Sequence, residues 1–186
     1  MPYPKRLDEP AIVTRALQLV QKGGRTALSM RTLAASLQVQ PSSLYRYFPN
    51  RTALESLLSE RAAAHLEQRM RRASRGKTAP DAVRFAGRVY TRFARDEPAM
   101  FELLLAPSAI DQPRPVGKSL WNFILEIVKG ITGKSDDTSA AVALWSFLHG
   151  FAVLEASGAF GASGPRHGFK VGLDALLRGF AGERSV

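Results

Sequence analysis

The chain has 186 residues, 45% of them hydrophobic, and a formal net charge of +10. It contains no cysteine, which excludes a disulfide framework and a thiolate metal site. Its charged start lacks the apolar stretch of a secretory signal, and no apolar run reaches the ~18 residues of a membrane-spanning helix, so we expect a cytoplasmic protein that does not enter a membrane.

The positive charge is concentrated in the N-terminal part of the chain. Residues 1–77 carry 14 Lys and Arg against 5 Asp and Glu, whereas residues 78–186 carry 12 against 11. A basic part joined to a near-neutral part suggests that one end meets a polyanion and that the other end does something else. Nucleic acid is the first candidate for this polyanion and an anionic membrane surface the second. A merely soluble basic surface is the simplest alternative.

The N-terminal part of the sequence predicts four helices. Apolar residues recur at helical spacing in each of them. Ser29 and Asn50 are typical caps, and Pro41 is a favourable first helical residue. The Gly23-Gly24 pair is typical of the end of the first helix. The expected helices cover about residues 8–23, 29–37, 41–48 and 50–72.

The segment at 73–80 breaks this pattern, and helical spacing then resumes in the rest of the chain. A Pro-rich stretch at 107–117 predicts a loop. No stretch alternates with period two for long enough to predict a strand, so we expect an all-α fold. The apolar stripes place the further helices around residues 86–96, 100–105, 121–128, 137–159 and 169–180.

The helix expected at 137–159 is apolar on nearly every side. A helix on a protein surface needs only an apolar stripe, so this helix must be covered on several sides. It is short for a membrane span and carries His149 and Glu155. We expect a second subunit to cover it together with the amphipathic last helix, so that the last two helices form a homodimer interface. The alternative is a central core helix of a monomer.

Residues 29–48 have the organisation of a helix-turn-helix motif. A longer helix precedes two short helices, which are separated by a turn at Gln38 to Gln40. In this motif the second short helix lies in the major groove of DNA and presents its N-terminal residues to base edges. Leu44 and Phe48, four residues apart, would hold this helix on its own domain. The other side chains of "QPSSLYRYFPNR" then face outward.

The outward residues suit the two kinds of contact that DNA offers. Backbone amides at helix starts favour phosphate, and hydroxyl groups and a cation add to them. Glutamine suits adenine, and arginine suits guanine. We expect phosphate contacts from Ser29, Ser43, Tyr45, Tyr47 and Arg51, base contacts from Arg31, Gln40 and Arg46, and contact with a thymine methyl or a phosphate from Pro41 and Ser42. The alternative for any one of them is an ordinary surface side chain.

The stretch "LSMRTLAASLQVQPSSLYRYFPNRTALESLL" resembles the DNA-binding domain of the TetR (tetracycline repressor) family of transcriptional regulators. The resemblance runs from about Lys5 to Leu58, and by position it places the DNA contacts on the same ten residues. It implies an all-α homodimer with a helix-turn-helix domain at 1–51 and an effector-binding and dimerisation domain at 52–186. The helix at 50–72 connects the two.

The sequence departs from the pattern of this family at two positions. Gln38 stands where the turn usually has glycine, so a residue with a side chain must adopt or avoid a positive φ there. Arg51 stands where the residue after the asparagine is usually lysine, and arginine should still hold a phosphate.

The stretch "LWSFLHGFAVLE", with Trp145, His149 and Gly150, is similar to a TetR-type C-terminal domain marked by a Trp-x-x-x-His-Gly pattern. Such a domain implies an effector pocket. The candidates for its wall are Phe93, Met100, Phe101, Leu104, Trp121, Leu125, Trp145 and His149. The alternative is a solid core, with His149 as a hydrogen-bonded buried histidine. The few charges between residues 98 and 128 favour an uncharged or weakly charged effector.

The sequence gives no sign of catalysis. The three histidines are far apart, and neither a phosphate-binding loop nor a nucleophile motif is present, so we expect no enzyme, no cofactor and no metal. We expect a DNA-binding regulator, a repressor that a small hydrophobic or aromatic effector releases from a palindromic operator. The alternative is a non-specific basic DNA-binding or architectural protein without an effector.

Overall fold

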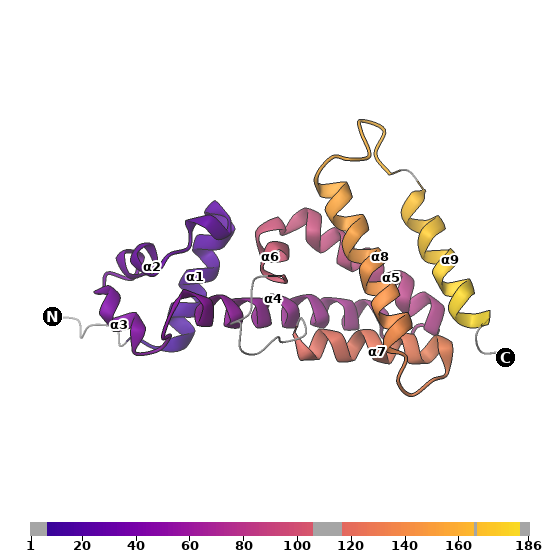
Figure 1. Ribbon diagram of the computed structural model, residues 1–186, viewed down its shortest axis with the longest axis horizontal. Helices are drawn as coiled ribbons and strands as arrows, with labels where there is room; N and C mark the ends of the chain where they lie inside the picture. The colour runs from indigo at the N-terminus through magenta and orange to yellow at the C-terminus, as the bar shows by residue number, and fades with distance from the viewer. Residues whose placement is uncertain (1–6, 106–116, 166, 183–186) are drawn as a thin grey trace. The chain divides into compact units, whose positions relative to one another are not determined.

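The computed structural model describes residues 7–105, 117–165 and 167–182. Every regular element within these ranges is helical (Figure 1), which confirms the all-α fold that the sequence predicts. The loop predicted at 107–117 lies outside the described residues except for its last residue.

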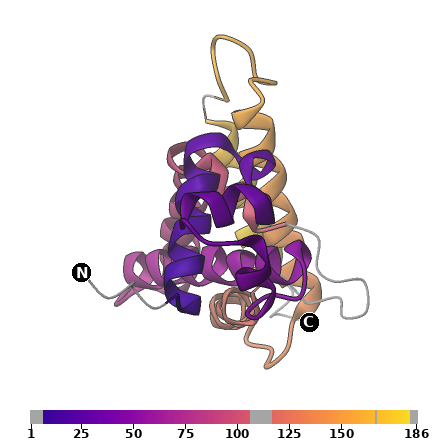
Figure 2. The same ribbon diagram turned by 90° about the vertical axis from the view of Figure 1, so that its left-hand side faces the viewer.

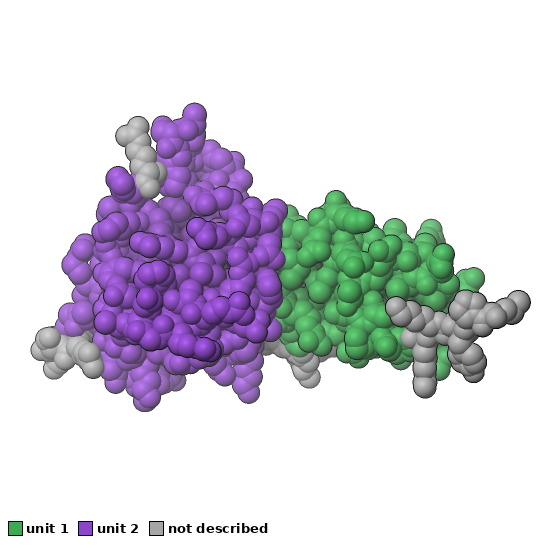
Figure 3. All heavy atoms as spheres, turned by 180° about the vertical axis from the view of Figure 1, so that it is seen from behind, with its two compact units in different colours: residues 1–62, 99–117 green, residues 63–98, 118–186 purple. Residues whose placement is uncertain are grey.

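Two compact units divide the chain, and Figure 3 colours them green and purple. The first takes residues 1–62 and 99–117, and the second takes residues 63–98 and 118–186. Helix α4 (Arg51–Ser74) therefore belongs partly to each unit. The functional boundary that we expect after Arg51 stays a prediction, because compactness alone does not locate the binding of DNA or of an effector.

In the first unit, α1, α2 and α3 gather into one group (Figure 1 and Figure 2). Helix α3 ends at Tyr45, earlier than the expected end at Phe48. Phe48 precedes Pro49, and a residue before proline disfavours helical conformation, which accounts for the exclusion of Phe48. The short 3-10 turn η1 is an element that the sequence did not predict. The bounds are α1 (Glu9–Gly23), η1 (Arg25–Ala27), α2 (Met30–Ser36), α3 (Pro41–Tyr45), the start of α4, and α6 (Pro98–Leu103), which belongs to this unit from Ala99 on.

The apolar faces of these helices form the core of the first unit. Ile12 and Val20 of α1, Leu33 of α2 and Leu44 of α3 are fully buried, and Phe48 is buried beside them in the chain. Each such side chain contributes about 1.5–3 kcal/mol to stability when it leaves water. The two residues that were expected to anchor the third helix, Leu44 and Phe48, therefore do face inward.

The turn between α2 and α3 places Gln38 in the left-handed region, with φ 57°. The amide of Val39 donates to the carbonyl of Ala34 at 3.0 Å, and the amide of Gln38 donates to the carbonyl of Ala35 at 3.1 Å. This pair of hydrogen bonds is the Schellman motif, in which glycine is the usual residue at the position of Gln38. The sequence left open whether Gln38 avoids a positive φ, and the structure shows that it adopts one.

Replacing Gln38 with Gly should therefore stabilise the protein. The left-handed conformation costs a residue with a side chain about 1–2 kcal/mol, and the greater freedom of glycine in the unfolded chain offsets part of the gain. We expect the melting temperature to rise by roughly 1–4 °C in thermal unfolding. The control is Gln38→Ala, which keeps a Cβ and should give no rise. An equal rise in both variants would rule out backbone strain as the cause.

In the second unit, α5 packs against α7 and α8, and α8 lies beside α9 (Figure 1). The approach of α8 and α9 is close at Gly172, where an added Cβ would lie 2.5 Å from the ring of Phe147. Helix α8 ends before residue 159 because Gly158, at φ 72°, closes it. The bounds are α5 (Ala79–Asp96), α7 (Lys118–Thr132), α8 (Thr138–Ala156) and α9 (Gly168–Gly182), with the end of α4.

Ion pairs join α5 to α8 and to α9 in this unit. Arg95 donates to both carboxylate oxygens of Glu155 on α8, at 3.0 and 2.9 Å. Arg84 donates to Asp174 on α9 at 2.9 Å, and Lys170 donates to the other oxygen of Asp174 at 2.7 Å. The hydrogen bonds from Lys170 and Arg84 lower the pKa of Asp174 to about 2. Asp174 therefore stays ionised at neutral pH and holds α9 to α5.

Helix α8 leaves much of its apolar surface uncovered. It is long and apolar enough to cross a membrane by length and composition alone, and only 28% of its apolar window is buried within the single chain. Exposed apolar side chains occur on both α8 and α9, among them Val142, Val153, Leu154 and Val171. The sequence predicted that this helix needs cover on several sides, and the described residues of one chain bury only a minor part of it.

Candidate nucleic-acid interface and ligand site

The outer face of the third helix and the turn after it is polar and aromatic. Leu44 is fully buried, whereas its neighbour Tyr45 is 51% exposed and Arg46 is exposed. Gln40 and Ser42 are also exposed, while Pro41 and Ser43 are half-buried. This alternation follows from the helical period, which turns one side of a short helix to its own core and leaves the other side to solvent.

Ser29 and Arg31 lie at the start of α2. The hydroxyl of Ser29 accepts the amide of Thr32 at 3.0 Å, and the hydroxyl of Thr32 accepts the amide of Ser29 at 2.9 Å. This capping box fixes the first turn of α2. It also commits the Ser29 oxygen to a structural hydrogen bond, while Arg31 remains exposed.

Two further residues expected to contact phosphate, Tyr47 and Arg51, also have partners within the protein. The hydroxyl of Tyr47 donates to the backbone carbonyl of Leu7. The guanidinium of Arg51 donates to the carboxylate of Glu55 through Nε at 3.0 Å and through Nη2 at 2.8 Å. Because a phenol has one hydrogen, Tyr47 must exchange this bond to donate to a phosphate, whereas Arg51 has hydrogens left.

In the second unit, a hydrogen-bonded chain links three of the aromatic residues. The indole Nε1–H of Trp145 donates to the hydroxyl of Tyr90 at 3.2 Å, and this hydroxyl lies 2.8 Å from Nδ1 of His149. Tyr90 is fully buried, while Trp145 and His149 are half-buried. The ring of Trp121 meets that of Trp145 edge-on, with centroids 6.4 Å apart. Trp145 and His149 thus share one face of α8, as their spacing predicts.

Burial shifts the pKa values of Tyr90 and His149 in this hydrogen-bonded group. It raises the pKa of the Tyr90 hydroxyl above its ordinary value, so that the phenol stays neutral, and it lowers the pKa of His149, which favours the neutral imidazole. Because an indole N–H can only donate, the oxygen of Tyr90 accepts from Trp145. Between Tyr90 and His149, the donor depends on which ring nitrogen of the imidazole carries the proton.

Replacing Tyr90 with Phe should therefore destabilise the protein without changing its shape. The ring stays, but the Trp145 N–H and the His149 Nδ1 lose their partner, at a cost of about 1–2 kcal/mol. We expect the melting temperature to fall by roughly 2–8 °C. Tyr45→Phe removes an exposed hydroxyl and is the control that should not change it. A Tyr90→Phe protein as stable as the wild type would show that the hydrogen bonds of the Tyr90 hydroxyl do not contribute to stability.

Comparison with known proteins identifies the family. A sequence profile described as "Bacterial regulatory proteins, tetR family" matches residues 12–55, and one described as "Tetracyclin repressor-like, C-terminal domain" matches residues 83–176, which is half of the chain. The chain belongs to the TetR family of transcriptional regulators. The resemblance that runs from about Lys5 to Leu58 is thereby confirmed.

Individual relatives agree with this membership. The uncharacterised HTH-type transcriptional regulator YobS of Bacillus subtilis is 24% identical over 156 residues, which cover 83% of this chain and 82% of YobS. A second uncharacterised HTH-type regulator, Rv0681 of Mycobacterium tuberculosis, is 26% identical over 166 residues, covering 83% of this chain and 73% of that protein. The TetR family is not enzymatic, which agrees with the lack of catalytic motifs in the sequence.

Solved structures show the same fold. A protein of unknown function from Rhodococcus sp. RHA1 superposes with a TM-score of 0.78 at 23% identity, covering 97% of this chain and 99% of that one. A TetR variant from Acinetobacter baumannii AYE, solved in complex with minocycline, has a TM-score of 0.70 at 22% identity, covering 97% and 100%.

The eight residues expected to line an effector pocket are divided between the two units. Met100, Phe101 and Leu104 are buried in the first unit, which contains the helix-turn-helix. Phe93 is fully buried on α5, and the centroids of its ring and of the His65 imidazole are 5.9 Å apart. Within the second unit, contacts join Trp121, Trp145 and His149, and Leu125 is half-buried on α7.

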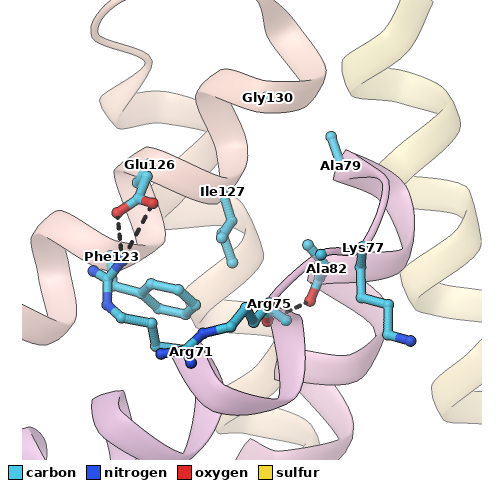
Figure 4. Close-up of a pocket in the computed structure, with 11 residues that line it drawn as sticks. Arg71, Arg75, Lys77, Ala79, Ala82, Phe123, Glu126, Ile127 and Gly130 are labelled. Atoms are coloured by element: carbon cyan, nitrogen blue, oxygen red, sulfur yellow. Dashed lines mark hydrogen bonds and ion pairs between the residues drawn. The ribbon is translucent and has the colours of Figure 1, made fainter.

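A separate hollow of about 450 Å³ opens in the second unit, where the end of α4, the start of α5 and α7 meet (Figure 4). None of the eight expected effector residues lines it. Arg71 lies over the ring of Phe123 and donates to Glu126 at 3.0 and 3.2 Å. Its hydrogen bonds with Glu67 and Glu126 raise the pKa of Arg71, so the ion pairs persist. This charged rim does not match the uncharged effector that the sequence favours.

Two functional candidates escaped the sequence analysis, and both contact residues far away in the chain. Tyr90 lies 55 residues from Trp145, and only the fold brings them together. Glu55 lies on the apolar side of α4 and pairs with Arg25, 30 residues earlier. The one local signal was the spacing of Glu55 four residues after Arg51, which is common on exposed helices and so is weak.

Proposed function

We propose that the chain is a homodimeric repressor that a small hydrophobic or aromatic effector releases from a palindromic operator. The observation that carries the DNA-binding half of this proposal is the third helix. Its apolar residues Leu44 and Phe48 are buried, while Gln40, Tyr45 and Arg46 are exposed beside it. A short helix that presents such a face suits insertion into the major groove.

In this proposal, some of the contact residues read the base sequence and the others position the protein on the DNA backbone. Arg46, Gln40 and Arg31 read base edges, because their side chains match the donors and acceptors of guanine and adenine. The neighbouring hydroxyls and the guanidinium of Arg51 bind phosphates and set the register. The remaining contacts are those of Ser29, Pro41, Ser42, Ser43, Tyr45 and Tyr47.

The homodimer uses α8 and α9. Val153 on α8 is 45% exposed, and Val171 on α9 is 63% exposed. An apolar surface of this kind is typical of an interface between subunits. A second copy would cover both helices with the same surface of its own, as a two-fold axis requires, and would place two reading helices on the two halves of a palindrome. We place the protein in the cytoplasm with no membrane contact.

The effector site of this proposal includes the half-buried aromatic rings of Trp121 and Trp145 together with His149, Leu125 and Phe93. Apolar walls with a few polar groups suit small aromatic molecules. The A. baumannii TetR in complex with minocycline supports the idea that this fold accommodates a ligand. Met100, Phe101 and Leu104 belong to the same proposal.

Release of the protein from the operator follows from the thermodynamic linkage between effector binding and DNA binding. An effector that prefers an arrangement of the dimer with the wrong spacing for the operator shifts the population away from the DNA-binding form. The operator must then weaken effector binding by the same factor. Helix α4 is continuous from residue 51 to residue 74 and enters both units, so we propose it as the connecting element.

Selection of bound duplexes from a random DNA pool tests this function. We expect a palindromic consensus with two half-sites about one helical turn apart. The affinity for this consensus should exceed that for random DNA by about 10³-fold or more at physiological salt. Binding without a consensus, with an affinity set by salt alone, would favour the non-specific architectural alternative.

A further inference from the structure

A buried carboxylate joins the start of α4 to the segment that leads into α2. Glu55 is 5% exposed. Its Oε1 accepts from Nε and Nη2 of Arg51 at 3.0 and 2.8 Å and from Nε of Arg25 at 3.3 Å. Nη2 of Arg51 also donates to the backbone carbonyl of Arg25 at 3.3 Å. We call these three residues the Glu55 brace, and all of them lie in the first unit.

The burial of Glu55 makes this cluster different from an ordinary surface ion pair. An exposed pair at i,i+4 contributes little to stability, because both side chains can exchange their partner for water. A buried carboxylate cannot do so, and it is costly unless cations and hydrogen bonds surround it. Arg25 and Arg51 meet this need, and Arg51 is therefore held in one conformation.

The brace leaves part of Arg51 available. A guanidinium has five N–H groups. Glu55 takes the Nε hydrogen and one Nη2 hydrogen, and the carbonyl of Arg25 takes the other Nη2 hydrogen. The two hydrogens of Nη1, on the edge opposite Glu55, remain for another acceptor. The Arg51 side chain is 43% exposed, and the brace has two cations for one anion.

The brace also lies at the right place in the motif. Arg51 directly follows Asn50, whose side chain accepts the amide of Ala53 at 2.8 Å and caps α4. It comes three residues after the buried Phe48 and five after Arg46. The residues that present the reading helix and the residue held by Glu55 therefore belong to one short, well-anchored stretch of chain.

We propose that Glu55 is a positioning residue for DNA binding, which orders Arg51 with its Nη1 edge outward before a phosphate arrives. Fixing a free arginine on binding would cost side-chain entropy, and an arginine that is already ordered loses less of it. Glu55 thus raises the affinity for every DNA sequence alike and reads none. This inference rests on the proposed contact of Arg51 with a phosphate.

A double-mutant cycle tests the proposal. Fluorescence anisotropy measures the affinity of wild type, Arg51→Ala, Glu55→Gln and the double variant for a labelled duplex of the selected sequence and for a random duplex. We expect Glu55→Gln to weaken binding to both duplexes by about 2- to 10-fold. Arg51→Ala should lower the slope of log affinity against log salt by about 1. The double variant should bind within about 2-fold of Arg51→Ala alone, because Glu55 acts only through Arg51.

The matched control is Glu67→Gln, which removes another i,i+4 partner of an arginine on α4, that of Arg71, and should leave affinity unchanged. Circular dichroism confirms folding. If Glu55→Gln does not fold, Arg51→Lys replaces it, because lysine keeps the charge but cannot form the paired Nε and Nη2 contact. This variant should then lose the same 2- to 10-fold.

Two results would overturn the proposal. One is a Glu55→Gln protein, or the Arg51→Lys protein that replaces it, that binds DNA as well as wild type or better. The other is a double variant in which the affinity losses of the two single variants multiply. Failures of its premises look different. Unchanged affinity and salt slope in Arg51→Ala would show that Arg51 does not contact a phosphate. A wild-type protein that binds no duplex would contradict the proposed function itself.

Discussion

Replacing Arg46 with Ala is expected to weaken binding to the selected operator by roughly 5- to 150-fold, which corresponds to about 1–3 kcal/mol. Arg46 is exposed at the end of α3, and no carboxylate among the described residues pairs with it. A guanidinium in this position can donate two hydrogen bonds to the O6 and N7 atoms of guanine. Its loss should therefore relax discrimination at one position of each half-site and change binding to random DNA much less.

Tyr45→Phe is the comparison for Arg46→Ala. Its hydroxyl is assigned to a phosphate, so its removal should lower affinity for all duplexes by the same small factor. The measurement is a set of anisotropy titrations against the consensus, single-base variants of it and a random duplex, all at one salt concentration. If Arg46→Ala lowered every affinity equally, Arg46 would contact the backbone and another residue would read the base.

A charge on the exposed apolar surface of α8 and α9 should separate the proposed dimer. Val153→Glu and Val171→Glu each place a carboxylate where the partner subunit would exclude water, and two-fold symmetry doubles each change. We expect the dissociation constant to rise by about 100-fold or more, so that sedimentation velocity at micromolar concentration shows monomers. Operator affinity should fall with it, because a monomer engages only one half-site.

The control for the dimer prediction is Phe85→Glu, which places the same charge on an exposed apolar position of α5. Leu148 is not a suitable position, because it is buried inside the unit and lies against Gly87, so a charge there would disturb the fold. Dimers that persist in both Val153→Glu and Val171→Glu would move the interface away from this surface.

The sequence predicted the features of this protein that depend on local pattern. Leu44 and Phe48 recur at helical spacing, which was enough to give the orientation of the third helix. The same holds for Trp145 and His149, whose spacing alone put them on one face of α8. The start of α4 at Arg51 followed from the cap at Asn50, because capping depends on neighbours within one turn.

What the sequence could not give depends on contacts between distant segments. The acceptor for Trp145 is a tyrosine on another helix, and periodicity describes Tyr90 only as an inward residue. Glutamates are rarely buried unless paired, and nothing in the local pattern indicates that Glu55 is buried. Its burial depends on Arg25 of η1, an element that the pattern did not predict. The conformation of Gln38 was undecided for a different reason, since its side chain permits but does not require a positive φ.

The length of α4 has a mechanical consequence. A straight helix of its 24 residues measures about 36 Å from end to end. A tilt of about 5° at one end moves the other end by about 3 Å, which is as long as a hydrogen bond. In the proposed mechanism, a slight adjustment of packing around a guest molecule would therefore be magnified along this one helix into a displacement large enough to break contacts with nucleobases.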